Sequence, residues 1–139
     1  MTLMDTRDVA TAYFDAWQTR DPDRFRALLA DDVTWQGPTW RAGNADECVA
    51  AFQRASSVVT RVDIQHLWAD GADAVTWFQM HKETDPPTPV ANWTHVENGV
   101  VTRVRTTLDL LPPTSAPAEH NVQRAPAIID RVRHTPSRR

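Results

Sequence analysis

The chain has 139 residues, one cysteine and a formal net charge of −3, from 18 acidic side chains against 15 lysines and arginines. This length fits one domain, and the mild charge, with a basic segment beyond Pro112 that lacks interleaved aromatic residues, gives no reason to expect a nucleic acid partner. A single cysteine excludes an intramolecular disulfide, and no stretch resembles a secretion signal or reaches membrane-spanning length, so we expect a cytoplasmic protein without membrane contact.

Two helices and a strand are predicted first. Residues 7–20 place apolar side chains at i, i+3, i+4 and i+7, the spacing of a helix with one buried stripe. Asp21 and Pro22 supply an N-cap and a proline at the first helical position, which indicates a short second helix. Residues 32–36 then alternate as a strand and stop at Gly37.

A third helix is predicted after residue 44. Asn44 with Glu47 three residues later resembles a capping box, the usual start of a helix. The apolar spacing that follows buries Cys48 and Phe52. In this setting Cys48 is expected to be a packed thiol rather than a nucleophile.

The rest of the folded region alternates with period two, which is typical of half-buried strands. Proline ends the last strand, since it cannot donate to a neighbouring strand. The predicted strands are 61–69, 74–83, 89–97 and 100–111.

Three helices followed by antiparallel strands indicate an α+β domain. We expect a curved antiparallel sheet that the helices close into a cone around a pocket. The domain is assigned to residues 1–111, and residues 112–139 form a Pro/Arg-rich extension with room for a short helix at 126–133.

The hairpin at Asn98-Gly99 leaves the strand register open. A strict two-residue turn places Trp93 and His95 on the inner face of the sheet. A three-residue turn with a left-handed Gly99 places Asn92 and Thr94 there instead, because a shift of one residue exchanges the faces. The second register is favoured.

Six tryptophans are more aromatic surface than a core of this size needs. Each indole can bury about 200 Å² and still donate a hydrogen bond. The surplus indicates a pocket with aromatic walls, a buried sheet face, or both.

Short motifs follow one another in a fixed order along residues 7–111. They are Ala12-Tyr13-Phe14, Trp17 and Asp21, then Leu28 through Val33, Gly43, Val90-Ala91-Asn92-Trp93, Val96 through Val101, Arg105 and Asp109. Their order and spacing resemble the SnoaL-like branch of the nuclear transport factor 2-like superfamily. The resemblance implies a cone-shaped fold and, often, a homodimer. It implies no single activity, because the superfamily includes isomerases, cyclases, hydrolases, dehydratases and proteins that only bind.

The resemblance can be tested position by position. Ketosteroid isomerases of this superfamily hold an oxyanion with a helix tyrosine and a protonated aspartic acid, and use a carboxylate base on the first strand. Tyr13 and Asn92 stand at the two oxyanion positions, and the Asn92 amide can donate without titrating. The base position falls on Gly37, which cannot take a proton. The arginine and two aspartates of limonene epoxide hydrolases correspond to Phe78, Met80 and Thr106.

The expected cavity has three polar side chains. Tyr13 and Asn92 would polarise a substrate oxygen, and His66, an imidazole suited to proton transfer near neutral pH, would act as general acid or base. Each also has a purely structural interpretation: Tyr13 as a packed ring, Asn92 as a structural amide, and His66 as a histidine hydrogen-bonded to its neighbours. No ligand spacing supports a metal, and no cofactor is expected. The expected substrate-binding residues are Trp17, Trp35, Phe52, Trp68, Phe78, Met80, Thr94, Thr106 and Leu108.

The opposite face of the sheet is expected to form a homodimer interface. Tryptophans beside arginines and histidines are poor candidates for full solvation, and exposed apolar area of this kind usually marks an interface. The residues assigned to this face are Trp77, Gln79, His81, Trp93, His95, Arg103, Arg105, Thr107 and Asp109.

Two functions are consistent with the sequence. The first is acid/base catalysis of the isomerase, cyclase or dehydratase type on a hydrophobic carbonyl or ring compound. The alternative is a module that binds a small hydrophobic molecule, or assembles as a dimer, without chemistry. The glycine at the base position favours the alternative.

Overall fold

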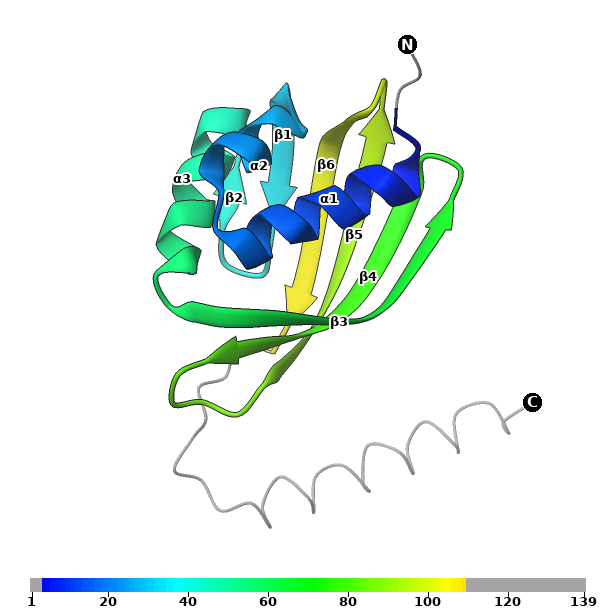
Figure 1. The fold of residues 1–139 in the computed structure, drawn as a ribbon. Coiled ribbons are helices and arrows are strands. Elements are labelled where there is room, and N and C mark those ends of the chain that lie inside the picture. The colour runs from blue at the N-terminus through cyan, green and yellow to red at the C-terminus, as the bar shows by residue number, and fades with distance from the viewer. Residues whose placement is uncertain (1–3, 110–139) are drawn as a thin grey trace, which may run out of the picture.

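The chain folds into three helices and a six-stranded sheet, which confirms the α+β prediction (Figure 1). This computed structural model describes residues 4–109, so the extension at 112–139 and its expected helix lie outside the described part. No helix within residues 4–109 is long and apolar enough to cross a membrane. The helices are α1 (Thr6–Thr19), α2 (Pro22–Ala27) and α3 (Ala45–Ser56), and the strands are β1 (Leu29–Gln36), β2 (Arg41–Ala42), β3 (Val59–Asp70), β4 (Asp73–Lys82), β5 (Thr88–Glu97) and β6 (Val100–Leu108).

The helices begin at side-chain caps that the sequence identifies. The Asp21 carboxylate accepts the Arg24 N–H at 3.1 Å, directly before Pro22. The Asn44 side chain accepts the Glu47 N–H at 2.8 Å. Each cap satisfies one of the amide groups that a helix start leaves without a partner.

The strand order is β2-β1-β6-β5-β4-β3. Neighbouring strands run antiparallel, as expected, except that β1 and β6 are parallel. β1 begins at Leu29, three residues before the predicted start, and the two-residue strand β2 was not predicted. The sheet does not close, so β2 and β3 are its edges.

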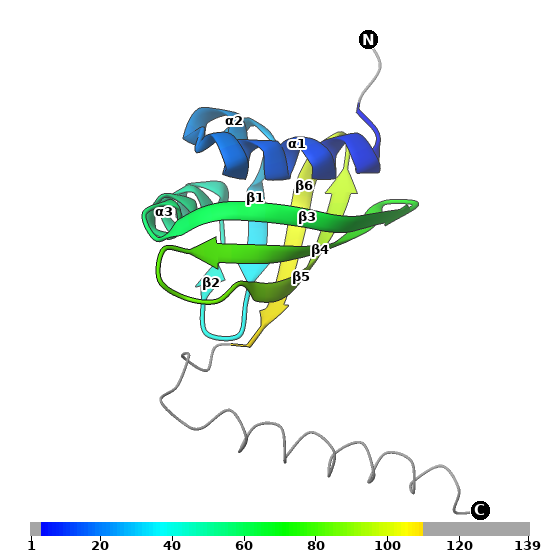
Figure 2. The same cartoon turned by 60° about the horizontal axis from the view of Figure 1, so that its bottom comes forward.

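Irregular pairing bends the sheet. β3 carries two register shifts against β4, one between Val59 and Arg61 and one between Ile64 and His66. A residue inserted in this way bends its strand and increases the local twist. In Figure 2, β3 and β4 accordingly sweep across β1 and β6. The bend produces a concave face, which the helices cover.

Helix α1 lies along the edge strand β3 and occupies its free backbone groups. The Arg7 guanidinium donates to the Leu67 carbonyl at 3.2 Å near one end of α1. At the other end the Gln18 amide donates to the carbonyl of Val62. An edge covered in this way is protected from pairing with another chain.

The turn between β5 and β6 has two residues, Asn98 and Gly99. Both have a left-handed backbone, with φ of 55° and 79°. This geometry matches the twist of a two-residue hairpin, and glycine adopts it without strain. The turn is therefore the shorter of the two alternatives.

A bulge at Thr102 nevertheless produces the favoured register. Val96 pairs with Val101, whereas His95 pairs with Arg103, so Thr102 is the additional residue on β6. The expected face is thus confirmed, although a bulge and not a longer turn creates it. The residues that share the inner face are Asn92, Thr94, Val104 and Thr106.

A small polar cluster forms on the outer face of the sheet. The Asp73 carboxylate lies 2.7 Å from His95 Nδ1 and accepts the Trp93 indole N–H at 2.8 Å. The His95 and Trp93 hydrogen bonds hold the pKa of Asp73 below its usual range. The ionised form of Asp73 is therefore favoured in the folded protein.

Replacing Asp73 by asparagine should lower the free energy of unfolding at neutral pH. The native pKa of Asp73 lies below its ordinary value of about 3.9, so the carboxylate stabilises the fold above that value and stops doing so as the pH falls through the native pKa. The deficit of the variant should shrink as the pH falls below about 4. Urea unfolding over this range measures it, with the exposed Asp63→Asn as the control. A deficit that stays the same at every pH would contradict the assignment.

Candidate functional site

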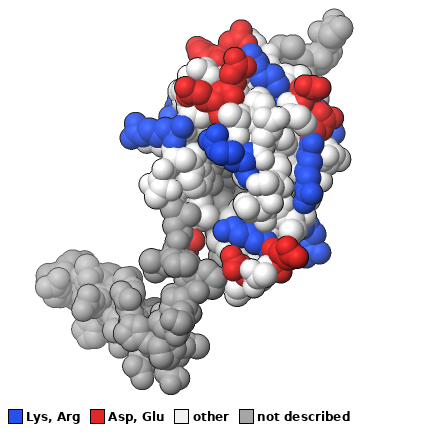
Figure 3. All heavy atoms as spheres, turned by 90° about the vertical axis from the view of Figure 1, so that its left-hand side faces the viewer, with Lys and Arg blue, Asp and Glu red and all other residues white. Residues whose placement is uncertain are grey.

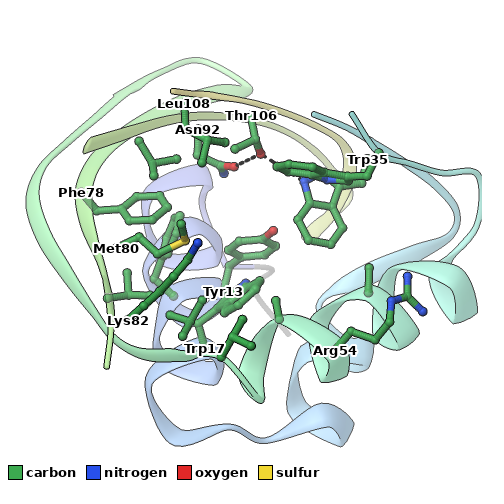
Figure 4. Close-up of a pocket in the computed structure, with 18 residues that line it drawn as sticks. Tyr13, Trp17, Trp35, Arg54, Phe78, Met80, Lys82, Asn92, Thr106 and Leu108 are labelled. Atoms are coloured by element: carbon green, nitrogen blue, oxygen red, sulfur yellow. Dashed lines mark hydrogen bonds between the residues drawn. The ribbon is translucent and has the colours of Figure 1, made fainter. Parts of the chain in front are cut away.

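A cavity of about 310 Å³ opens between the concave face of the sheet and the helices (Figure 4). This volume is at the small end of the range of about 300–1,000 Å³ for ligand sites. Most of its walls are aromatic or aliphatic. The lining residues are Tyr13, Phe14 and Trp17 of α1, Ala51, Arg54 and Ala55 of α3, Val58, Trp35 and Trp40, and Val59, Val62, Phe78, Met80, Lys82, Val90, Asn92, Thr106 and Leu108 of the longer strands.

Three side chains on neighbouring strands form a chain of hydrogen bonds at one end of the cavity. The Trp35 indole N–H donates to the Thr106 hydroxyl at 3.1 Å, and that hydroxyl donates to the Asn92 amide oxygen at 2.6 Å. The bonds fix the orientation of the amide, because its oxygen faces Thr106. The other half of the amide, Asn92 Nδ2, is buried and has no hydrogen-bond partner.

Two further donors belong to the cavity wall. Tyr13 is almost fully buried, and burial raises the pKa of its phenol far above the usual value, with a smaller opposite effect from Trp17. The phenol is therefore neutral and keeps its proton. Figure 4 shows the Tyr13 oxygen turned toward the middle of the cavity. The indole nitrogen of Trp40 is also buried without a partner.

Groups that could exchange a proton near neutral pH are missing from this wall. None of the lining residues in the described range is an aspartate, glutamate or histidine. Cys48 lies in the core behind the cavity, and burial raises the pKa of its thiol to about 11. Within residues 4–109, no three His, Cys, Asp or Glu side chains are grouped to hold a metal ion. The site offers donors but no base.

Eight of the residues expected at the site line this cavity. Tyr13 and Asn92 lie there, as the resemblance implies. So do the expected wall residues Trp17, Trp35, Phe78, Met80, Thr106 and Leu108.

His66 and Trp68 lie elsewhere, and the prediction that they face the cavity is wrong. Val62 and Ile64 face inward as expected, but Gln65 is the extra residue of the second bulge in β3. The following residues are thereby moved to the opposite face. His66 and Trp68 are exposed on the outer face, where their rings stack at 5.2 Å. An alternating pattern of four residues gives no sign of the bulge.

Phe52 and Thr94 are buried but do not line the cavity, which corrects their assignment as substrate-binding residues. The Phe52 ring stacks on Phe25 at 4.3 Å, between α3 and α2, and forms a layer behind the wall. Thr94 is fully buried further along β5, where its hydroxyl donates to the Ala74 carbonyl. Both residues belong to the core.

The lining residues that the sequence did not predict include Trp40, Arg54 and Lys82. Trp40 follows the Gly37-Pro38 turn, where no periodic pattern shows which way a side chain points. Arg54 and Lys82 are charged residues near the ends of α3 and β4, and such residues are usually assigned to solvent. No local pattern in the sequence marks Lys82 as a residue of the cavity.

Gly37 is covered by the Trp40 ring. A Cβ atom placed at Gly37 would lie 2.3 Å from two atoms of the Trp40 indole. The Gly37 N–H also donates to the Trp40 carbonyl at 3.0 Å, which closes the turn between β1 and β2. Gly37, which the resemblance places at the base position of ketosteroid isomerases, therefore has neither a carboxylate nor room for one.

The bent sheet with its three covering helices is the fold of the nuclear transport factor 2-like α+β proteins. The chain belongs to the SnoaL-like family, since the family model for the SnoaL-like domain matches residues 10–127. A search of curated proteins finds no significant match to the sequence.

Several solved structures share this fold. A protein from Kribbella flavida is 23% identical with a TM-score of 0.73, and the alignment covers 91% of this chain and 97% of that one. A candidate ketosteroid isomerase from the same organism is 25% identical with a TM-score of 0.69, over 83% and 85% of the two chains. An LEH-like epoxide hydrolase from M. tuberculosis is 24% identical with a TM-score of 0.66, over 76% and 83%. Similarity at this level shows the fold and leaves the activity open.

Substitution of Gly37 by alanine should test how tightly Trp40 covers this position. We expect the free energy of unfolding to fall by about 1–3 kcal/mol, because the new methyl group and the indole overlap. In a Trp40→Ala background the same substitution should cost little, because the overlap is gone. Urea unfolding of the four proteins in this double-mutant cycle gives both values. An equal cost in the two backgrounds would show that the indole does not restrict the site.

Proposed function

We propose that the cavity binds a small, largely apolar molecule through one oxygen acceptor. The observation that carries this proposal is the Asn92 amide, whose Nδ2 is buried and unpartnered while its oxygen is held by Thr106. The aromatic and aliphatic walls provide the apolar contacts. A few convergent polar groups in an apolar cavity are typical of small-molecule sites.

The energetics favour an occupant with an acceptor oxygen. A buried donor without a partner costs about 1–3 kcal/mol, which a ligand oxygen within hydrogen-bond distance recovers. Asn92 and Trp40 both carry such donors, and Tyr13 adds a phenol that stays protonated. A carbonyl or ether oxygen suits all three, whereas a ligand that can only donate does not.

Acid/base catalysis on a hydrophobic carbonyl or ring compound is the second candidate function. Preorganised donors such as Tyr13 and Asn92 can stabilise a developing oxyanion in a site that excludes water. An isomerase, cyclase or dehydratase also needs a group that takes a proton. His66, the residue expected in that role, lies on the outer face, and the described lining residues include no carboxylate or histidine that could replace it. Binding with polarisation of the ligand oxygen therefore ranks above proton transfer.

The substitution Asn92→Asp tests the free donor while it keeps the shape of the side chain. A carboxyl in this apolar wall should have a raised pKa. Its protonated form can donate like the amide, but its ionised form repels an acceptor oxygen. Binding of 2-tetralone, measured by quenching of tryptophan fluorescence, should weaken by about tenfold or more as the pH rises through that pKa. The native protein should show no such dependence on pH.

Two controls accompany this measurement. The hydrocarbon tetralin has the same rings but no oxygen, so its affinity for the Asn92→Asp variant should not vary with pH. Gln53→Glu makes the same chemical change on the exposed side of α3 and should behave as the native protein. Equal effects on the ketone and the hydrocarbon would remove Asn92 as the donor. A product from the ketone that disappears with Asn92→Asp would establish the catalytic candidate instead.

We also propose that the outer face of the sheet forms a homodimer. Trp68 is 56% exposed and Trp77 is 37% exposed, and both belong to an apolar patch on neighbouring strands. Such a patch on a small protein commonly marks an interface. The exposed apolar residues on the outer face of β3 and β4 that support the proposal are Trp68, Val75 and Trp77.

Trp77→Glu should convert the dimer to a monomer, because a charge would then be buried without a partner at the interface. Sedimentation velocity at several concentrations measures the change in mass. Val58→Glu places the same charge on an exposed apolar residue at the cavity side and should leave the mass unchanged. A native protein that sediments as a monomer at every concentration would rule out the interface.

A further inference from the structure

Two cationic side chains lie at the rim of the cavity, whose walls are otherwise mostly apolar. Lys82 is the last residue of β4, and Arg54 lies in the last turn of α3. Both are among the lining residues. Basic side chains also surround a hollow on the face of the molecule that carries α3 (Figure 3). The rim is therefore positively charged, whereas the wall is neutral.

Neither cation forms an ion pair with another residue of the described range. Arg26, in contrast, contacts Asp31 at 2.9 Å and Asp46 at 3.4 Å. The absence of a partner matters most for Lys82, because its side chain is half-buried against the cavity wall. A cation beside an apolar surface is stabilised when an anion binds next to it.

Two structural explanations account for these cations only in part. Arg54 lies where the helix dipole favours positive charge, so α3 alone can explain its presence. A lysine can also pack its methylene groups on apolar surface and extend its ammonium group into water. Figure 4 shows the opposite arrangement for Lys82, since its nitrogen is turned toward the middle of the cavity beside Met80.

The cations and the free amide lie at opposite ends of the cavity. Figure 4 shows Asn92 and Thr106 on one side, with Lys82 and Arg54 across from them. Along β4, Lys82 is six residues beyond Thr76, the residue that pairs with Asn92. At about 3.3 Å per residue this stretch of strand is about 20 Å long, and the bend of the sheet and the two side chains shorten the gap between the polar groups.

We infer that the cavity takes a small hydrophobic carboxylate, whose charged group binds Lys82 at the rim and whose second oxygen accepts from Asn92 at the inner end. This inference rests on the proposed function and specifies the ligand class for the same cavity. An aryl or alicyclic keto acid has the required arrangement: an apolar body, a carbonyl at one end and one negative charge at the other. Lys82 supplies specificity for the charge, and Arg54 adds to the local potential.

Calorimetric titration of the full 139-residue chain with 4-(4-acetylphenyl)butanoate and with its methyl ester tests the inference. The two probes share the phenyl ketone and differ in charge. The carboxylate should bind about tenfold more tightly than the ester. Its affinity should fall when NaCl is raised from 50 to 500 mM, because salt screens the charge, while the affinity of the ester should not.

The substitution Lys82→Met keeps much of the apolar stem and removes the charge. It should bring the affinity for the acid down to that for the ester and leave the ester unchanged. Arg41→Met removes one charge from an exposed residue outside the cavity and should keep the native preference. Thermal melting identifies any variant that fails to fold, in which case Lys82→Gln replaces it.

The outcomes separate this inference from the proposed function. Equal binding of acid and ester by the native protein, or an unchanged preference in the Lys82 variant, would overturn the carboxylate assignment and leave the hydrophobic site in place. Failure of both probes to bind would overturn both.

Discussion

The bend of the sheet is the constraint on which the cavity depends. Without the irregular pairing in β3, this strand would continue as a flat edge and its inward side chains would pack directly against the helices. Helix α1 holds the bent strand in place, because side chains near both of its ends bind backbone carbonyls of β3. The aromatic residues beneath α1 can therefore line a space of about 310 Å³ and need not fill it.

The same hydrogen bonds that join three strands also prepare the site. Trp35 lies on β1, Thr106 on β6 and Asn92 on β5, and the pairing of β1 with β6 brings Trp35 close to Thr106. Each bond satisfies a polar group that burial would otherwise leave alone. This series of hydrogen bonds ends at Asn92 Nδ2, a buried group without a protein partner. A network that stabilises the fold thus leaves one oriented donor for a ligand.

The distribution of charge is the reason that we propose ligand binding in preference to proton transfer. Neutral donors occupy the interior, cations occupy the rim, and the described carboxylates and histidines lie outside the cavity. Trp40 also fills the space beside Gly37, the position that the resemblance assigns to a catalytic base. A family whose members share one cone-shaped fold can in this way keep a ligand cavity while its chemistry changes, because the fold sets the cavity and a few side chains set the reaction.

The sequence by itself determined the helix starts, the period-two strands and the inward positions of Tyr13 and Asn92, since caps, alternation and family motifs are local signals. It placed most of the aromatic wall for the same reason. Only the tertiary structure decided that His66 faces outward, that Trp40 covers Gly37 and that Lys82 reaches the rim. Pairing and packing between distant segments select a bulge or a turn of this kind. The local sequence at the bulge or turn therefore does not predict it.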